Sequence, residues 1–310
     1  MSDCIIVQPI ARSAIDLLRA AGLKVFFSPS PELEAFRAEL MSASAVITRN
    51  AGFSAEAIAA APRLRVIGSH GTGTNTIDRE AATARGISIV NTPGANARSV
   101  AELAITLLLA CARGIPAADA AVRDGDNSYR IRSSGIELYG RALGLVGFGH
   151  VARCVSRLGV AFGMKVTGWS RRASPDEMQA AGITPVADLD QLLATSDVIS
   201  LHSVSVGPPL LDATRLGMIK SGAILINTAR GALVDEIELA RMLVSGHLAG
   251  AGLDVFAIEP LAALHPLLGA PNLVLTPHIG GSTVEALERT GIEVACRVIQ
   301  ALGLSVPSNP

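Results

Sequence analysis

The sequence of 310 residues is short of charge and has no excess of either sign. Only 17% of its residues are Asp, Glu, Lys or Arg, and 26 basic against 27 acidic residues give a formal net charge of −1. Proteins that hold nucleic acid by counterion release need a positive excess, so we expect no nucleic-acid partner. Hydrophobic residues make up 49% of the chain, which excludes a disordered protein.

The chain also lacks long hydrophobic runs. Its longest uncharged apolar run, Leu103 to Ala112, lies between Glu102 and Arg113 and is far shorter than the ~20 residues that span a bilayer. The run predicts a buried helix, and we expect no membrane partner. The N-terminus carries Asp3 in place of a basic segment followed by a long apolar stretch, so we expect a cytoplasmic protein.

Cysteine is scarce and scattered. The four cysteines, Cys4, Cys111, Cys154 and Cys296, stand singly, with no CxxC pair and no histidine at a metal-ligand spacing. We therefore expect buried free thiols and no metal site.

The order of the remaining residues predicts an α/β fold. Short β-branched runs alternate with Ala-rich helical stretches, the pattern of a parallel sheet with helical crossovers. The length favours two domains, at roughly 100 to 200 residues per domain. A helix is expected to begin with Ser30 as its cap and Pro31 in its first turn. The strands predicted in the first part of the chain are Ile5–Val7, Lys24–Phe27, Ala45–Thr48, Leu64–Gly68 and Ile87–Val90.

A second series of six strands matches a doubly wound dinucleotide-binding domain in number and spacing. These strands are Ala142–Gly147, Lys165–Trp169, Val198–Leu201, Ala223–Asn227, Gly250–Val255 and Leu273–Thr276. A helix over Thr283–Leu302 follows the complete sheet and is expected to return to the first domain. We predict two doubly wound parallel-sheet domains with a cleft between them. Residues 98–283 form a Rossmann domain, and residues 1–97 with 284–310 form a discontinuous, flavodoxin-like substrate domain.

One glycine-rich loop has the context of a dinucleotide fingerprint. It follows a strand, opens a helix and reads Gly147-Phe148-Gly149-His150-Val151-Ala152. In such a loop the first glycine makes the turn, the second lets the backbone approach a pyrophosphate, and a small third residue permits close packing of helix and strand. The helix N-terminus then faces the phosphates.

A second glycine-rich loop, Gly71-Thr72-Gly73-Thr74, also follows a strand. It does not fit the dinucleotide pattern, because its third small position is Thr76 and no strand ending in an acid follows at the right distance. Two interpretations stay open: a tight turn, or a backbone site for a carboxylate at the carboxyl edge of the first sheet.

The strand after the fingerprint helix bears on the identity of the cofactor. It ends in Ser170-Arg171-Arg172, where an NAD enzyme has an Asp or Glu that binds the ribose 2′-hydroxyl. A hydroxyl and two guanidiniums suit a 2′-phosphate, so we expect NADP(H) to be preferred. If the two arginines only form a solvated turn, NAD(H) is accepted as well.

Three polar residues, Arg230, Glu259 and His278, follow the last three predicted strands. Reduction of a 2-keto acid needs a cation that holds the carboxylate and a proton donor aimed at the carbonyl oxygen. Arg230 fits the first role and His278 the second. Glu259 would bind the other ring nitrogen and favour the protonated ring. Asp254, at a strand end, is a candidate to orient the nicotinamide carboxamide.

Several segments can be compared with a known family: Gly-Phe-Gly-His-Val-Ala at 147–152, Asn-Thr-Ala-Arg-Gly at 227–231, Gly-Leu-Asp-Val-Phe at 252–256 with Glu259-Pro260, Thr-Pro-His-Ile-Gly-Gly at 276–281, and Asn-Thr-Pro-Gly-Ala-Asn at 91–96. Together they resemble the D-isomer-specific 2-hydroxyacid dehydrogenases. The resemblance implies that Arg230, Glu259 and His278 are catalytic and that Gly73 and Thr74 offer backbone amides to the substrate carboxylate. The residues expected at the cofactor are Gly147, Gly149, His150, Val151, Ser170, Arg171, Arg172, His202, Thr228, Ala229, Asp254 and Gly280.

The same resemblance implies a homodimer formed through the dinucleotide-binding domain. The stretch Ser99–Arg123 is too apolar for a solvated connector, so we expect part of it in a twofold interface.

The chain departs from the family pattern at a few positions. Ser170 replaces the NAD-type acid, as in glyoxylate and hydroxypyruvate reductases that resemble NADPH enzymes. Ser69 stands where phosphoglycerate-type members tend to place Arg, and His202 lacks the proline that usually follows it. The leading hypothesis is an NADPH-preferring reductase of glyoxylate or hydroxypyruvate. The alternatives are an NAD-dependent dehydrogenase of the phosphoglycerate type and a non-catalytic, NAD-binding corepressor-like protein.

Overall fold

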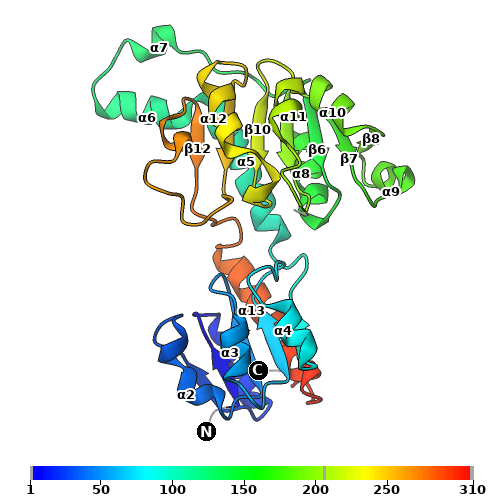
Figure 1. Ribbon diagram of the computed structural model, residues 1–310. Helices are drawn as coiled ribbons and strands as arrows, with labels where there is room; N and C mark the ends of the chain where they lie inside the picture. Colours follow the sequence, from blue (N-terminus) through cyan, green and yellow to red (C-terminus); the bar gives the residue numbers. More distant parts are fainter. Residues whose placement is uncertain (1–2, 205–206, 308–310) are drawn as a thin grey trace. The chain divides into compact units, whose positions relative to one another are not determined.

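The computed structural model describes residues 3–204 and 207–307. Two compact units divide the chain: unit 1 extends up to Asn96 and resumes at Gly281, and unit 2 is Ala97–Gly280. The sequence-based boundaries fall at 97/98 and 283/284. Figure 1 shows the course of the chain through each unit.

Unit 1 is built on a five-stranded sheet in which every neighbouring pair is parallel. The order β2-β1-β3-β4-β5 is that of a flavodoxin-like sheet. The strands are β1 (Cys4–Ile6), β2 (Val25–Phe27), β3 (Ala45–Thr48), β4 (Val66–Ser69) and β5 (Ser88–Val90).

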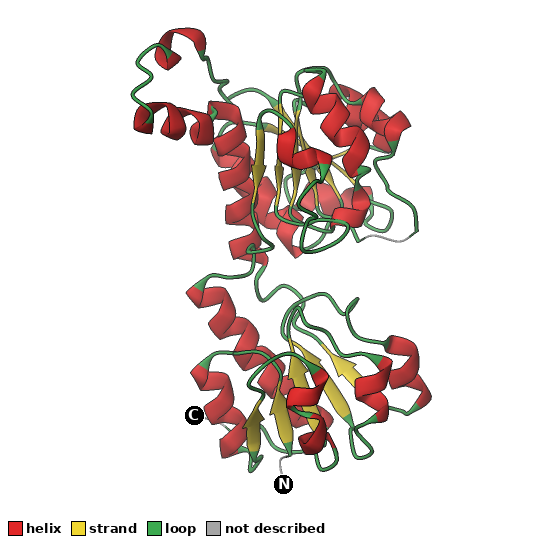
Figure 2. Cartoon of the chain, turned by 60° about the vertical axis from the view of Figure 1, so that its left-hand side comes forward, coloured by secondary structure: helices red, strands yellow, loops and turns green. Residues whose placement is uncertain are grey.

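Helices cover both faces of this sheet, as Figure 2 shows. Alternate strand residues face opposite sides, because successive side chains of a strand point to opposite faces. Cys4 and Ile6 pack in a cluster with α1 and α13, whereas Ile5 packs in a cluster with α2, α3 and α4. The helices are α1 (Arg12–Ala20), α2 (Arg37–Leu40), α3 (Ala55–Ala59), α4 (Arg79–Ala84) and α13 (Val284–Ala301).

Unit 2 is built on a seven-stranded parallel sheet in the order β12-β11-β10-β9-β6-β7-β8. The prediction of an α/β fold with two doubly wound parallel sheets is therefore confirmed. The sequence predicted six strands where the sheet has seven. The missing strand is β8, which has only two residues. The strands are β6 (Ala142–Val146), β7 (Lys165–Trp169), β8 (Thr184–Pro185), β9 (Val198–Leu201), β10 (Ile224–Asn227), β11 (Gly250–Leu253) and β12 (Leu273–Leu275).

Two layers of helices enclose the second sheet. Leu143 and Leu145 of β6 pack in a cluster with side chains of α5 and α8, while Ile199 and Leu201 of β9 pack in a cluster with α10, α11 and α12. The helices are α5 (Ala97–Arg113), α6 (Ile115–Arg123), α7 (Tyr129–Arg132), α8 (His150–Ala161), α9 (Pro175–Ala180), α10 (Leu189–Thr195), α11 (Ala213–Met218) and α12 (Glu236–Val244), with 3₁₀ turns η2 (Gly231–Leu233) and η3 (Pro266–Gly269).

The predicted long apolar helix is present but interrupted. α5 buries Leu107 and Leu108, as expected for a core helix, and the chain turns at Gly114, whose φ is 57°, before α6 begins. Among the described residues no single helix is long and apolar enough to cross a membrane, and the pair α5 and α6 that together reach the length is bent by 60°.

The prediction that a helix begins at Ser30 is wrong. The Ser30 hydroxyl accepts the backbone N–H of Glu32 at 3.3 Å and so closes a local turn. The chain then forms η1 (Leu33–Ala35), and α2 starts only after Phe36, whose φ is −136°. Phe36 is buried and stacks on Phe53 with ring centroids 6.4 Å apart. Packing of this aromatic ring therefore overrides the local helix signal.

The four cysteines are free thiols, as predicted, but the predicted burial is complete only for Cys4, and the other three are partly buried. Burial raises the pKa of Cys4 and of Cys111 to about 12. These thiols are therefore poor nucleophiles at neutral pH.

Candidate functional site

Arg230, Glu259 and His278 follow three neighbouring strands of unit 2. Arg230 comes after β10, Glu259 after β11 and His278 after β12, and these strands are adjacent in the sheet. The strands are parallel, so their carboxyl ends meet at one edge, where open α/β sheets bind ligands. The topology thus gathers three side chains that are far apart in the sequence.

The Glu259 carboxylate and the His278 imidazole are in direct contact, with 2.7 Å between Oε2 and Nδ1. The second carboxylate oxygen, Oε1, accepts the backbone N–H of Phe256 at 3.0 Å. A carboxylate at Nδ1 holds the proton on that nitrogen in the neutral ring and leaves Nε2 for a ligand. The side chains of His278 and Glu259 are 40% and 36% exposed, so a small molecule can reach them.

The loop that presents His278 is organised around Asp254. His278 has a φ of 55°, unusual for a residue other than glycine, and its N–H donates to the Asp254 carbonyl at 2.8 Å. The buried Asp254 carboxylate accepts the Thr276 hydroxyl at 2.6 Å and the N–H groups of Ile279 and Gly280 at 2.8 Å each. Strained backbone of this kind persists only where its surroundings fix it. A carboxylate offers about four acceptor positions, and these contacts occupy three of them.

The turn that carries Arg230 is fixed by its neighbours. The Asn227 side chain accepts the N–H of Ala229 at 3.0 Å and donates to the carbonyl of Arg230 at 2.9 Å. A Cβ on Gly231 would lie 1.8 Å from the carbonyl carbon of Phe256, so only glycine fits there. The Arg230 turn therefore lies directly against the loop that follows β11.

The Arg230 guanidinium is half-buried. Burial lowers its pKa, and the charge of Glu259 opposes that shift; an arginine nevertheless stays protonated in proteins. Its Nη1 donates to the carbonyl of Ala229 at 2.6 Å. Because a guanidinium has five N–H donors, this arrangement leaves donors for a carboxylate or a carbonyl oxygen.

The fingerprint loop joins β6 to α8 at the point where the strand order of unit 2 reverses. Gly147 has a φ of 108°, and a Cβ there would lie 2.6 Å from the carbonyl oxygen of His202. Gly149 is exposed, with nothing within 4 Å of a Cβ position, and Ala152 is buried. His150 begins α8, followed by Val151. A tight first glycine, an open second glycine and a helix N-terminus fit a dinucleotide pyrophosphate.

Three further predicted cofactor residues lie at the same edge of the sheet. His202 follows β9, and Thr228 and Ala229 follow β10. Burial lowers the pKa of His202 to about 3, so its ring is neutral, and Nε2 lies 2.9 Å from the Ser200 hydroxyl. The Thr228 hydroxyl is buried without a hydrogen-bond partner in the described part of the chain. A polar ligand that reaches Thr228 would satisfy this hydroxyl.

The turn after β7 holds Ser170, Arg171 and Arg172. The Ser170 hydroxyl accepts the N–H groups of Arg172 at 3.2 Å and of Ala173 at 3.1 Å. Both guanidiniums are exposed, and that of Arg171 lies 5.9 Å from the ring centroid of Trp169. The turn therefore offers a hydroxyl and two cations, and no acid, at the end of the second strand of this domain.

Gly73 and Thr74 belong to unit 1, in the loop that follows β4. The Ser69 hydroxyl donates to the Gly73 carbonyl at 2.6 Å, and the Thr74 hydroxyl accepts a hydrogen bond from Arg79 at 3.0 Å. Within residues 3–204 and 207–307 the backbone N–H groups of Gly73 and Thr74 donate to no acceptor. Carbonyl and side-chain contacts thus fix the loop and leave two amides for an anion.

Two residues of unit 1 that sequence reasoning missed lie at the carboxyl edge of its sheet. Arg49 follows β3, donates from Nη1 to the Pro9 carbonyl at 3.0 Å and has its pKa lowered by burial. His70 follows β4; its Nε2 is buried without a partner among the described residues, and burial together with the charge of Arg49 lowers its pKa to about 4. Arg49 comes directly after the predicted strand Ala45–Thr48, and His70 comes two residues after the end of Leu64–Gly68. This position near strand ends was the signal that could have identified them.

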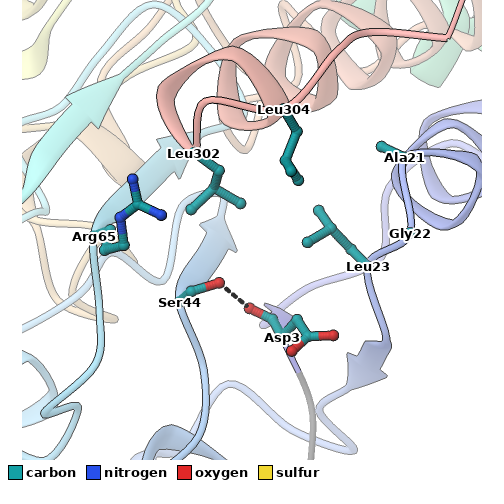
Figure 3. Close-up of a pocket in the computed structure, with 8 residues that line it drawn as sticks. All are labelled: Asp3, Ala21, Gly22, Leu23, Ser44, Arg65, Leu302 and Leu304. Carbon is teal, nitrogen blue, oxygen red and sulfur yellow. Dashed lines mark hydrogen bonds between the residues drawn. The ribbon is translucent and has the colours of Figure 1, made fainter.

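A pocket of about 310 Å³ in unit 1 lies at the opposite, amino edge of the sheet. Figure 3 shows Asp3, Ser44 and Arg65, which precede β1, β3 and β4, together with Leu302 and Leu304 beyond α13. The Ser44 hydroxyl donates to the Asp3 carbonyl at 3.0 Å. Ligands of open α/β sheets bind at the carboxyl ends of the strands, so this pocket is separate from the candidate site.

Residues 105–280 match the family model of the NAD-binding domain of the D-isomer specific 2-hydroxyacid dehydrogenases. This segment includes the fingerprint loop and Arg230, Glu259 and His278.

Two relatives are similar in sequence to most of the chain. D-3-phosphoglycerate dehydrogenase of Mycobacterium tuberculosis is 41% identical over 283 residues, which cover 90% of this chain and 53% of the relative. Hydroxypyruvate reductase of Thermotoga maritima is 40% identical over 260 residues, which cover 81% of this chain and 82% of the relative. The chain spans about half the length of this phosphoglycerate dehydrogenase.

Solved structures with the same fold match both units. The TT0316 protein from Thermus thermophilus is 35% identical, with a TM-score of 0.87 and 98% of each chain covered. A glyoxylate reductase from Paecilomyes thermophila is 31% identical, with a TM-score of 0.85, 97% of this chain and 95% of that chain covered.

Proposed function

The chain belongs to the D-isomer specific 2-hydroxyacid dehydrogenase family, and we propose that it reduces a small 2-keto acid of the glyoxylate or hydroxypyruvate type to the D-2-hydroxy acid. The observation that carries the proposal is the 2.7 Å contact between Glu259 and His278 on the unit that also holds Arg230 and the fingerprint loop. A relative and a solved structure named for these two reductase activities support the substrate class.

In this proposal each of the three residues has a separate task. Arg230 binds the substrate carboxylate and polarises the carbonyl with its remaining donors. The dinucleotide, when bound, supplies the hydride. His278 gives the proton on Nε2 to the carbonyl oxygen, which becomes the hydroxyl of the product. Glu259 stabilises the imidazolium before the transfer and holds the Nδ1 proton of the neutral ring after it.

NADPH is the proposed reductant. Ser170, Arg171 and Arg172 offer donors and positive charge at the turn where an NAD-type acid is absent. A solved structure of the same fold, at 28% identity and a TM-score of 0.85, is an imino acid reductase in complex with NADPH. Gly73 and Thr74 remain the predicted amide donors to the substrate carboxylate.

A phosphoglycerate-type activity is the second candidate, because relatives that are 41% identical to this chain bear that name. Arg49 favours it too: a half-buried guanidinium at the carboxyl edge of unit 1, in no ion pair among the described residues, suits an anionic group on a longer substrate. Ser69 in place of an arginine counts against it.

We also propose that two copies of the chain associate through unit 2. Figures 1 and 2 show α6 and α7 extending away from the sheet of this unit. Val122 of α6 and Ile131 of α7 are 81% and 85% exposed. Large apolar side chains exposed on a projecting segment are typical of a protein interface.

Turnover of glyoxylate, hydroxypyruvate and 3-phosphohydroxypyruvate with NADPH and with NADH tests the proposal. Reduction of one of the first two, faster with NADPH, is expected. Preference for the phosphorylated acid with NADH would favour the second candidate. Cofactor binding without reduction of any 2-keto acid would contradict an enzymatic role.

A further inference from the structure

A second carboxylate–imidazole pair lies beside the Glu259 loop. Glu236, the first residue of α12, is only 9% exposed. Its Oε1 accepts the backbone N–H of Ala257 at 2.7 Å, and its Oε2 lies 3.4 Å from Nε2 of His265. A buried carboxylate is costly unless it gains such partners. Both oxygens of Glu236 are therefore committed to the two segments around it.

The protonation pattern of His265 follows from its other nitrogen. Nδ1 accepts the N–H of Leu267 at 3.3 Å and caps η3, so in the neutral ring the proton is on Nε2. This nitrogen lies 3.4 Å from Oε2 of Glu236. The contact links η3 to the start of α12.

The segment that Glu236 holds is the one that carries Glu259. Ala257 follows Phe256, and the Phe256 N–H is bound by Oε1 of Glu259. Two successive N–H groups are thus held by two different carboxylates, one from α12 and one from the loop itself. The second oxygen of Glu259 then reaches His278 at 2.7 Å. A shift at Ala257 would move this contact.

The charges around Glu236 argue against a purely stabilising role. Burial raises the pKa of Glu236, and the nearby charges of Glu259 and Asp235 raise it further, while the Ala257 N–H and His265 lower it. Two carboxylates in one neighbourhood oppose each other. Carboxylates whose burial and like-charged neighbours cost stability are concentrated at functional sites.

We propose that Glu236 and His265 are positioning residues that hold the loop of residues 256–259, so that Glu259 meets Nδ1 of His278. The inference rests on the proposed function, since it assigns the pair a task in presenting the proton donor. Neither residue is expected to touch substrate or cofactor.

The variants Glu236→Ala, Glu236→Gln and His265→Ala test this role in the intact chain. Glu236→Ala removes the acceptor for the Ala257 N–H. We expect its kcat for the best 2-keto acid to fall roughly tenfold to a hundredfold, the scale of a small misplacement of a catalytic group, with the KM for NADPH nearly unchanged. Glu236→Gln keeps an acceptor oxygen and should restore part of kcat. His265→Ala should lie between the two.

The pH profile separates positioning from stability. The charged groups that act on Glu236 are Asp235, the N-cap of its helix, Glu259 on the loop after β11 and His265 before η3. Removing its negative charge in Glu236→Gln makes the surroundings of Glu259 and His278 less favourable to an imidazolium. The fall of the reduction rate on the basic side should therefore move to lower pH.

Asp197→Asn is the matched control. Asp197 is also a partly buried carboxylate of unit 2 that accepts a backbone N–H, from Ala142 at 2.8 Å, and binds a cation, Lys220 at 2.7 Å. It precedes β9, at the amino edge of the sheet. This variant should lower the unfolding temperature but leave kcat and the pH profile unchanged.

Imidazole NMR of the ligand-free protein tests the positioning without any turnover. Glu236→Ala should change the ring resonances of His278, and Asp197→Asn should not. Unaltered His278 resonances, or a kcat and pH profile no different from those of Asp197→Asn, would overturn the inference. If the wild type reduces no 2-keto acid while the His278 resonances respond to Glu236→Ala, the proposed reaction fails and the positioning contact stands.

Discussion

Glu259 combines two contacts whose loss has different consequences. One carboxylate oxygen binds the Phe256 N–H, and the other binds Nδ1 of His278. An amide in place of the carboxylate keeps an acceptor for one of these contacts but cannot stabilise a positive imidazole as an anion does. The charge of Glu259 can therefore be tested apart from its shape.

Glu259→Gln is expected to leave keto-acid binding nearly intact and to move the basic-side fall of the reduction rate to lower pH.

His278→Ala should reduce turnover by roughly a hundredfold or more, the usual scale for a lost general acid. Arg230→Ala should damage both affinity and turnover, because in the proposed reaction Arg230 holds the substrate carboxylate and the developing alkoxide. Rates of NADPH oxidation between about pH 5 and pH 9 give these values, and near-normal turnover of His278→Ala would exclude it as the proton donor.

The turn of Ser170, Arg171 and Arg172 allows a test of the cofactor preference. Replacing Arg171 and Arg172 together by Ala removes up to two charge-assisted contacts worth ~1.5 to 3 kcal/mol each. The KM for NADPH should rise far more than the KM for NADH. Arg157→Ala, an exposed arginine on α8, is a control for the loss of positive charge. Equal effects on the two cofactors would refute the 2′-phosphate assignment.

Position at the ends of strands explains which site residues could be predicted. Arg230, Glu259 and His278 follow readable strands, and parallel strands place their carboxyl ends together. Glu236 and His265 gave no such signal, because one begins a helix and the other caps a 3₁₀ turn. Their proximity depends on how α12 and η3 pack, and sequence spacing does not contain that information.

The elements themselves were predictable where hydrophobic runs were long. Every strand except β8 was predicted, and β8 was missed because two residues, Thr184 and Pro185, carry no periodicity. The helix assigned to Ser30 failed because burial of Phe36 and the turn at Ser30 prevail over a good capping sequence. The break between α5 and α6 depends on the positive φ of Gly114.

The projecting helices α6 and α7 lead to a test of assembly. If their exposed apolar side chains form a twofold interface, the wild-type chain should sediment as a dimer at micromolar concentration. Replacing Val122 and Ile131 by Asp should produce a folded monomer, because two buried charges per copy would oppose association. Val244→Asp, at an exposed apolar residue at the end of α12, is the control. A stable wild-type monomer would contradict the interface.

At the scale of the whole molecule, each unit contains a histidine that burial keeps neutral. Burial lowers the pKa of His70 in unit 1 to about 4 and that of His202 in unit 2 to about 3. In the unfolded chain both rings return to about 6.5. The unfolded state therefore takes up protons before the folded state as the pH falls, and the stabilisation present above pH ~6.5 is lost on acidification.

Thermal unfolding between about pH 7.5 and pH 5 checks this dependence. The free energy of unfolding should decrease as the pH is lowered, by up to about 2 kcal/mol for each histidine over this window. His70→Gln and His202→Gln should each flatten the curve, since glutamine does not titrate. His247→Gln, which removes a ring whose Nε2 lies 2.8 Å from the Ile219 carbonyl, is the matched control for the loss of an imidazole. Unchanged slopes in both test variants would show that these rings do not control the acid response.

The return of α13 to unit 1 has a consequence for the order in which the protein is made. α13 packs in one cluster with Ile6, Ile47 and Val66 of the first sheet, through Val294 and Val298 among others. In the chain it follows all of residues 97–280. A ribosome therefore releases the whole of unit 2 before α13 emerges. Throughout that interval the part of this face that α13 covers is open to water, to chaperones and to neighbouring nascent chains. The unit whose synthesis starts first is thus the last to become compact.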